Sequence, residues 1–215
     1  WQLIQKSMQA NTAVMLLYVL ESKGSSPGRQ GFCMAVNANG DMQGSLGGGV
    51  MEHKFVELAK KKLVAAASKV VVKKQIHDKA AAKNRSGMIC SGEQTIFLYT
   101  LHKEDANVVT SVIHAIKRSK NTTLVITPKG FSLSESVLDK AHAVQWKSST
   151  DFVYEERIGY LYHLYIVGGG HCSLALSELM HKMDFYIHLY DTRQGLNTMA
   201  GNKFVHEKVV LENYN

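Results

Sequence analysis

A run of three glycines followed by a histidine has the residue types that most directly suit ligand chemistry. Gly168-Gly169-Gly170-His171-Cys172-Ser173 resembles the GxGxxG pattern, in which a tight turn and a bare backbone let a phosphate approach a helix N-terminus. Asp191 ends the next apolar stretch, about 20 residues further on, where a ribose-binding acid normally lies. The spacing predicts a nucleotide or phosphate site that includes Gly168, Gly170, His171 and Asp191. The alternative is a strand-to-helix turn that holds no ligand.

A second glycine run, Gly47-Gly48-Gly49, lies in the segment Gly44-Ser45-Leu46-Gly47-Gly48-Gly49 and also leads into an expected helix. Consecutive glycines lose much backbone entropy on folding, so a plain turn does not explain them well. They allow close approach by an anionic ligand or, alternatively, by another backbone. Glu52, in the first turn of that helix, suits either a helix cap or a ligand contact.

Two further loops carry polar or nucleophilic groups. The loop Gly24-Ser25-Ser26-Pro27-Gly28-Arg29 offers the hydroxyls of Ser25 and Ser26, and Arg29 can bind a carboxylate or phosphate in bidentate fashion. Cys90 lies among small residues in Met88-Ile89-Cys90-Ser91-Gly92, directly before an expected strand. A thiolate there could ligate a metal or transfer sulfur, although a buried and inert cysteine is the plainer reading. We expect Cys33 and Cys172 to serve packing.

These loops need strands and helices to position them, and the periodicity predicts an α/β protein. We expect a mixed α/β domain over residues 1–157 and a Rossmann-like βαβ domain, apparently incomplete, over residues 158–215. The segment 130–157 reads as a hairpin remnant and linker. Helical periodicity is expected at 1–11, 50–64, 108–116 and 174–180, and strand character at 13–22, 32–37, 70–76, 94–100, 122–127, 160–167 and 185–190.

Composition excludes several classes of protein. The 215 residues are 45% hydrophobic and 20% charged, and no apolar run approaches the roughly 18 residues that cross a bilayer. The net charge of +7 favours anionic partners, but the lysine-rich stretch 57–85 has no aromatic residue, which argues against nucleic acid. Three distant cysteines without a CxxC pair indicate neither a disulfide framework nor a zinc site and favour a reducing, cytoplasmic compartment.

Taken together, the loops resemble the XdhC/CoxI family of accessory proteins for xanthine dehydrogenase and related molybdenum hydroxylases. The stretches that carry the resemblance are 21–29, 40–52, 87–92 and 166–171, with Asp191-Thr192-Arg193. The family's cysteine loop usually reads Cys-Gly-Gly, whereas Ser91 replaces one glycine here.

The resemblance implies a non-catalytic chaperone that binds the molybdenum cofactor (molybdopterin) while a cysteine desulfurase supplies its sulfido ligand. The cofactor then passes to apo xanthine dehydrogenase or a related hydroxylase, and a homodimer is expected. The implied cofactor contacts are Ser25, Ser26, Arg29, Gly47, Gly48, Gly49 and Cys90, with Cys90 as a molybdenum ligand, while Gly168, Gly170, His171 and Asp191 would hold a nucleotide or the nucleotide form of the cofactor.

Two other functions stay open from the residues alone. An NAD-dependent oxidoreductase fits the glycine fingerprint, and Asp191 would favour NAD over NADP. No general acid/base pair is evident near that fingerprint, and hydride transfer normally needs one. A plain interaction module, in which the glycines serve packing, is the third reading.

Overall fold

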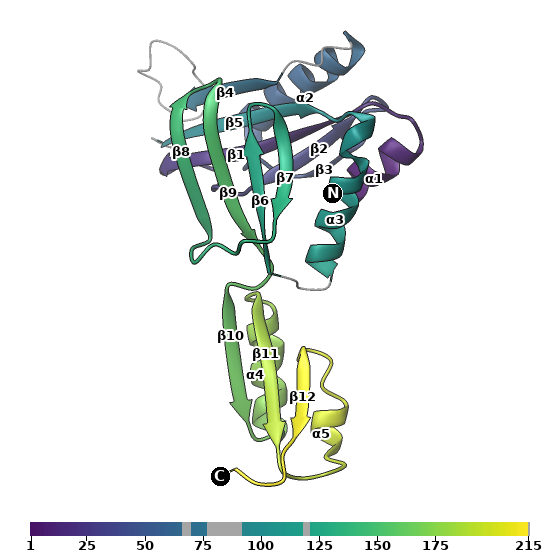
Figure 1. The fold of residues 1–215 in the computed structure, drawn as a ribbon, viewed down its shortest axis with the longest axis vertical. Helices are drawn as coiled ribbons and strands as arrows, with labels where there is room; N and C mark the ends of the chain where they lie inside the picture. The colour runs from purple at the N-terminus through teal and green to yellow at the C-terminus, as the bar shows by residue number, and fades with distance from the viewer. Residues whose placement is uncertain (66–69, 77–91, 118–120, 215) are drawn as a thin grey trace. The chain divides into compact units, whose positions relative to one another are not determined.

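The computed structural model describes residues 1–65, 70–76, 92–117 and 121–214, which fall into two compact units, Trp1–Ile158 and Gly159–Asn215 (Figure 1). The described residues form helices and three β-sheets, which confirms the α/β class. Each unit has its own hydrophobic core. No helix in these ranges is long and apolar enough to span a membrane.

The first unit is built on a five-stranded antiparallel sheet in the order β3-β2-β1-β5-β4. The central strand alternates its apolar side chains between two cores, because successive residues of a strand point to opposite faces. Met15, Leu17 and Val19 pack under α2, whereas Leu16 and Tyr18 pack on the other face. The strands are β1 (Val14–Gly24), β2 (Cys33–Asn37), β3 (Met42–Gly44), β4 (Val71–Ile76) and β5 (Gly92–Thr100), and the helix on one face is α2 (Gly49–Val64).

The other face of this sheet is covered by two helices and a second sheet, in the order β7-β6-β9-β8. The reading of residues 130–157 as a linker was wrong, because three of these four strands come from it. The elements are α1 (Gln2–Gln9), η1 (Lys103–Asp105), α3 (Ala106–Lys117), β6 (Thr122–Thr127), β7 (Gly130–Ser134), β8 (His142–Ser148) and β9 (Asp151–Ile158).

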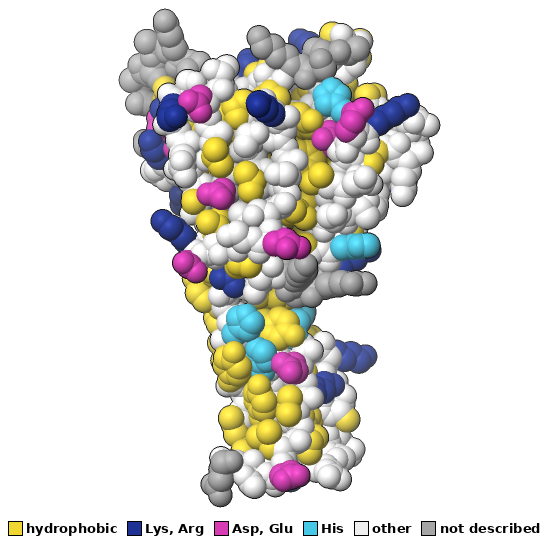
Figure 2. Space-filling view, viewed as in Figure 1, with side chains coloured by type: hydrophobic (Ala, Val, Ile, Leu, Met, Phe, Trp, Pro, Cys, Tyr) yellow, Lys and Arg dark blue, Asp and Glu magenta, His cyan; other side chains and the backbone are white. Residues whose placement is uncertain are grey.

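The second unit is a parallel sheet in the order β10-β11-β12, with β10 and β11 joined by α4 as the βαβ pattern predicts. Ile166, Ile187 and Leu189 form the core on one face. The opposite face carries aromatic and histidine side chains, which gather on the visible side of this unit in Figure 2. The elements are β10 (Tyr162–Val167), α4 (His171–His181), β11 (Phe185–Asp191), α5 (Asn197–Ala200) and β12 (Glu207–Val210).

Candidate functional site

Two of the predicted loops meet in the first unit, beside Gly92, the one described residue of a third. Gly24 pairs with Gly92 at the end of the β1/β5 ladder, so the loop after β1 starts beside the first described residue of β5. A Cβ on Gly92 would lie 2.4 Å from the backbone nitrogen of Ser26, and one on Gly28 would lie 2.0 Å from the carbonyl oxygen of Leu46. The loops are therefore in direct backbone contact, although they are far apart in the sequence.

Gly47 serves this backbone contact rather than an open approach to a ligand. It has a φ of +116°, and a Cβ there would lie 2.3 Å from the backbone nitrogen of Gly28. Gly48 differs, because it has a φ of +78° and no atom within 4 Å of where its Cβ would lie. Gly49, with a φ of +72°, begins α2. Within the glycine run, Gly48 thus has the open space that a ligand would need.

Gln94 joins the two glycine-containing loops through its side-chain amide. Its Nε2 donates to the carbonyl oxygens of Gly28 at 3.1 Å and Leu46 at 3.0 Å, and the residue is only 1% exposed. Buried carbonyl groups need such partners. Sequence reasoning missed Gln94, since its partners lie in loops that only the fold brings near.

The carboxylate of Glu52 accepts hydrogen bonds from N–H groups of the glycine loop. Its Oε2 accepts hydrogen bonds from Ser45 Oγ at 2.7 Å and from the N–H groups of Leu46 at 2.7 Å and Gly48 at 3.0 Å. Burial by itself raises the pKa of this carboxyl, but these hydrogen bonds outweigh burial and hold the pKa below its ordinary value. Glu52 therefore holds the loop that leads into α2, and an anionic ligand at these N–H groups would have to compete with it.

In the loop after β1, the Ser26 hydroxyl is buried in a hydrogen bond within the loop, whereas the side chains of Ser25 and Arg29 are exposed. Ser26 is buried, and its Oγ donates to the carbonyl oxygen of Gly28 at 3.0 Å. The guanidinium of Arg29 donates to the carbonyl oxygen of Gly24 at 3.1 Å on the protein surface. The side chains of Ser25 and Arg29 are therefore the polar groups of this loop that a ligand in solvent can reach.

The three cysteines differ in how far the structure describes them. Cys90 lies outside the described residues. Cys33 is half-buried against the core, and burial raises the pKa of its thiol. Cys172, expected to serve packing, is exposed in the first turn of α4, so that expectation was wrong. Within the described ranges, no three His, Cys, Asp or Glu side chains form a group that could hold a metal ion.

In the second unit, Gly168, Gly169 and Gly170 form the turn from β10 into α4. Gly168 has a φ of +103° and donates its N–H to the carbonyl oxygen of Tyr190 at 2.7 Å. Gly169 packs against Leu196 and Met199, whereas Gly168 and Gly170 have open space where a Cβ would lie. His171 is exposed at the first position of α4. Gly168 and Gly170 therefore leave the room that a phosphate at this helix N-terminus would require.

Asp191 lies beside this turn, but its carboxylate already has four donors. It accepts from the N–H of Gly169 at 2.6 Å, from the N–H of Arg193 at 2.8 Å, and from Arg193 Nε and Nη2 at 3.0 and 2.7 Å. The Arg193 side chain first, and then the two N–H groups, hold the pKa of this carboxyl far below its usual range. The side chain of Asp191 is fully buried while that of Arg193 is 60% exposed, so Arg193 is the more accessible charge.

Small polar side chains complete the turn. The buried Ser173, at the third position of the glycine pattern, donates its hydroxyl to the carbonyl oxygen of Gly170 at 2.7 Å. Thr198 donates to the carbonyl oxygen of Gly169. No pattern in the sequence pointed to Thr198, because its contact with Gly169 depends on the position of α5. Ser173 meets the requirement for a small residue where the helix packs on the strand.

Residues 7–73 match the XdhC and CoxI family, which confirms the resemblance over the stretch that contains both loops of the first unit. A solved structure of a xanthine dehydrogenase from Bacillus halodurans superposes with a TM-score of 0.64 and 16% sequence identity. The match covers 98% of this chain and 67% of that one, and at this identity it shows similarity of fold. No curated protein matches the sequence.

Proposed function

We propose that this protein is an accessory protein that binds the molybdenum cofactor and delivers it to a xanthine dehydrogenase or a related molybdenum hydroxylase. The observation that carries the proposal is the backbone contact of two family-like loops at Gly28 and Leu46, beside Gly92 at the end of a third. The family match over residues 7–73 includes two of them. When bound, the cofactor would supply the molybdenum centre with which the recipient enzyme works.

The described residues fit the phosphorylated end of such a cofactor. Arg29 and Ser25 present an exposed guanidinium and hydroxyl, and Gly48 leaves open space at the start of α2. A guanidinium is the side chain best suited to a phosphate, because its donors match two phosphate oxygens at once. Ser26 and Gly47 would support these groups by holding the loop backbones together, and Gly49 by starting α2.

Cys90 belongs to the proposal through the family resemblance and its place just before Gly92 in the sequence. We propose it as the group that contacts molybdenum or assists sulfuration by a cysteine desulfurase. In the second unit, Gly168, Gly170 and His171 would receive a phosphate, either from a separate nucleotide or from the nucleotide form of the cofactor. Because Asp191 is saturated by Gly169 and Arg193, it would act there by orienting Arg193.

The NAD-dependent oxidoreductase is less favoured than the accessory protein. An acid that selects an unphosphorylated ribose must offer a carboxylate oxygen to the ribose hydroxyls. The Asp191 carboxylate is fully buried, and its oxygens already accept hydrogen bonds from Gly169 and Arg193. Binding of NAD would therefore require Arg193 to move away first.

Equilibrium ultrafiltration tests the proposal with the purified chain, using molybdenum cofactor in one sample and NAD in another. We expect retention of close to one pterin per chain, detected by fluorescence after oxidation, and weak retention of NAD. Arg29→Gln should reduce pterin retention, whereas Lys140→Gln, which removes an exposed charge elsewhere on the first unit, should not. Retention of NAD without pterin would replace the accessory role by the oxidoreductase.

Reconstitution of an apo-hydroxylase tests Cys90 separately from cofactor binding. Cys90→Ala should lower the yield of sulfurated, active enzyme, with Cys172→Ala as the matched control because that exposed thiol directly follows a family-like stretch but lies in the other unit. An unchanged yield from Cys90→Ala would remove this thiol from the mechanism while leaving cofactor binding intact.

A further inference from the structure

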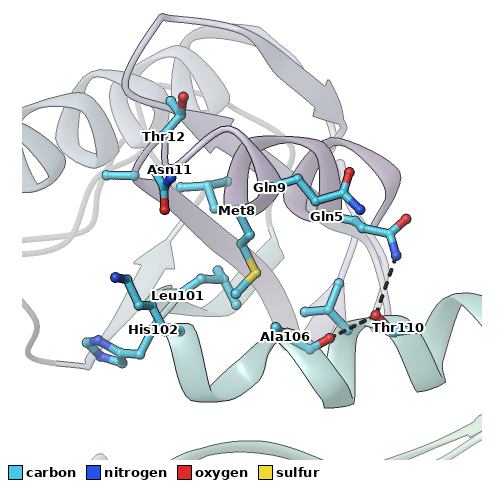
Figure 3. Close-up of a pocket in the computed structure, with 13 residues that line it drawn as sticks. Gln5, Met8, Gln9, Asn11, Thr12, Leu101, His102, Ala106 and Thr110 are labelled. Carbon is cyan, nitrogen blue, oxygen red and sulfur yellow. Dashed lines mark hydrogen bonds between the residues drawn. The ribbon is translucent and has the colours of Figure 1, made fainter.

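A cavity of about 810 Å³ lies in the first unit between α1, the start of β1 and α3, and none of the predicted site residues lines it (Figure 3). Its volume is within the range of about 300–1,000 Å³ that is typical of small-molecule sites. Met8, Leu101 and Ala106 supply accessible apolar surface to the wall, and the buried Val14 and Val109 lie behind it. The cavity can therefore take the apolar body of a ligand.

The polar groups around this cavity are amides, hydroxyls and one ammonium. Gln5, Gln9 and Asn11 contribute the amides, and Lys103 contributes the ammonium from the segment that follows β5. The ring of His102 packs against Tyr99 instead. No aspartate or glutamate lines the cavity. The cavity wall therefore carries a positive side chain but no negative one, which suits an anionic ligand.

Two acids follow Lys103 in the sequence, Glu104 and Asp105, and neither lines the cavity. Asp105 accepts hydrogen bonds from the N–H of His102 at 2.7 Å and from the Tyr99 hydroxyl at 3.2 Å. These contacts fix the turn that carries His102 and Lys103 just before α3. The carboxylate of Asp105 does not line the cavity, so it does not oppose an anion there.

The rim of the cavity is also defined by particular contacts. Asn11 has a φ of +52°, a conformation that asparagine tolerates better than most residues, and it turns the chain from α1 into β1. Gln5 Nε2 donates to Thr110 Oγ1 at 3.4 Å and so links α1 to α3 beside the opening. This long hydrogen bond can be exchanged for one to a ligand.

We propose that this cavity binds a small amphiphilic monoanion. Its apolar chain would lie on Met8, Leu101 and Ala106, and its carboxylate would face Lys103 and the nearby amides. The proposal stands apart from the cofactor function, because its residues belong to neither glycine loop.

Isothermal titration calorimetry with octanoate tests the proposal, with 1-octanol and octylammonium as probes of equal chain length. We expect one octanoate per chain and weaker binding of both other probes. Ala106→Trp should abolish octanoate binding, because Ala106 lines the cavity on α3 and a ring there would fill it. Lys103→Gln should weaken octanoate binding by roughly fivefold, the effect of one exposed ion pair, whereas Lys140→Gln should leave it unchanged.

Thr110→Phe, on the same face of α3 and in the same wall, serves as a second filling variant if Ala106→Trp melts below the parent chain. Octanoate binding that survives a folded filling variant would place the ligand elsewhere and overturn the proposal. Equal affinities for octanoate and octylammonium would also overturn it, since they would show no preference for an anion. Failure of all three probes to bind would overturn it as well, whatever the outcome with the molybdenum cofactor.

Discussion

Gln94→Leu should strongly destabilise the first unit, because it removes the amide that joins the two loops. Leucine has a similar volume, so the packing is largely kept, but it cannot donate to the carbonyl oxygens of Gly28 and Leu46. Each buried carbonyl left without a donor costs about 1–3 kcal/mol. We therefore expect a loss of about 3 kcal/mol in the free energy of unfolding, and a melting temperature lower by roughly 6–12 °C for a unit of this size.

The matched control is Gln75→Leu. Gln75 lies opposite Gln94 on the neighbouring strand β4, but among the described residues its amide donates only to the exposed carbonyl oxygen of Lys74. Urea denaturation of both variants, followed by circular dichroism, measures the difference directly. If the two variants lie within about 0.5 kcal/mol of each other, Gln94 does not hold the loops together and the reasoning fails.

Gln94→Glu tests the same contacts through pH. A carboxylate of the same shape would face two carbonyl oxygens and repel both, whereas the protonated acid can donate to one of them. The stability of this variant should therefore rise as the pH falls, because protonation restores a donor. A stability that falls with pH in parallel with the parent chain would show that the side chain has left the contact.

Three further changes test single contacts. Gly47→Ala should cost about 3 kcal/mol or more, since a Cβ would overlap the backbone of Gly28 at a positive φ, and its urea midpoint should fall well below that of Gly40→Ala, where φ is also positive but space is open. The lowered pKa of Glu52 gives stability that is present above about pH 4.5 and is lost as the pH falls through the folded-state value. In Glu52→Gln the melting temperature should therefore depend less on pH below about pH 5 than it does in the parent chain. The pKa of His206 is lowered by burial and then by the nearby His181, His188 and His163. The second unit should therefore lose stability below about pH 6.5, and His206→Gln should reduce that loss. An unchanged dependence of stability on pH in this variant would show that His206 is not responsible.

Periodicity predicted the elements whose burial follows a simple pattern. The β1 strand has apolar side chains on both faces, and α2 repeats them at helical spacing, so both were evident from the sequence. The segment 130–157 was misread because β8 is mostly exposed and gives no strong apolar signal. Its partner β9 also pairs with β6, and such pairings between distant segments leave no local trace.

The candidate site was predictable where a single residue type fixes the geometry. Glycine runs indicated the turns at Gly47 and Gly168, both of which have a positive φ. The sequence did not reveal that Gly28 and Gly47 face each other, or that Gln94 bonds both loops, because those contacts depend on how β1, β3 and β5 are ordered in the sheet. Arg193 was visible beside Asp191, but its pairing to that carboxylate required the fold.

Both glycine loops follow one physical scheme. In the first unit Glu52 accepts from the N–H groups of Leu46 and Gly48, and in the second unit Asp191 accepts from the N–H of Gly169. A carboxylate of the chain itself therefore occupies donors that an anionic ligand could otherwise use.

A phosphate at either loop would therefore have to displace the carboxylate from these N–H groups or rely on side chains. Arg29 in the first unit and Arg193 in the second are exposed positive side chains in or beside the loops. Because both are exposed, their attraction for an anion is screened by salt, with a Debye length of about 8 Å at physiological ionic strength. Cofactor retention should thus fall as salt rises, and Arg29→Gln should remove much of that dependence. A retention that is insensitive to salt in the parent chain would instead indicate that the ligand displaces Glu52 or Asp191 and binds the backbone N–H groups directly.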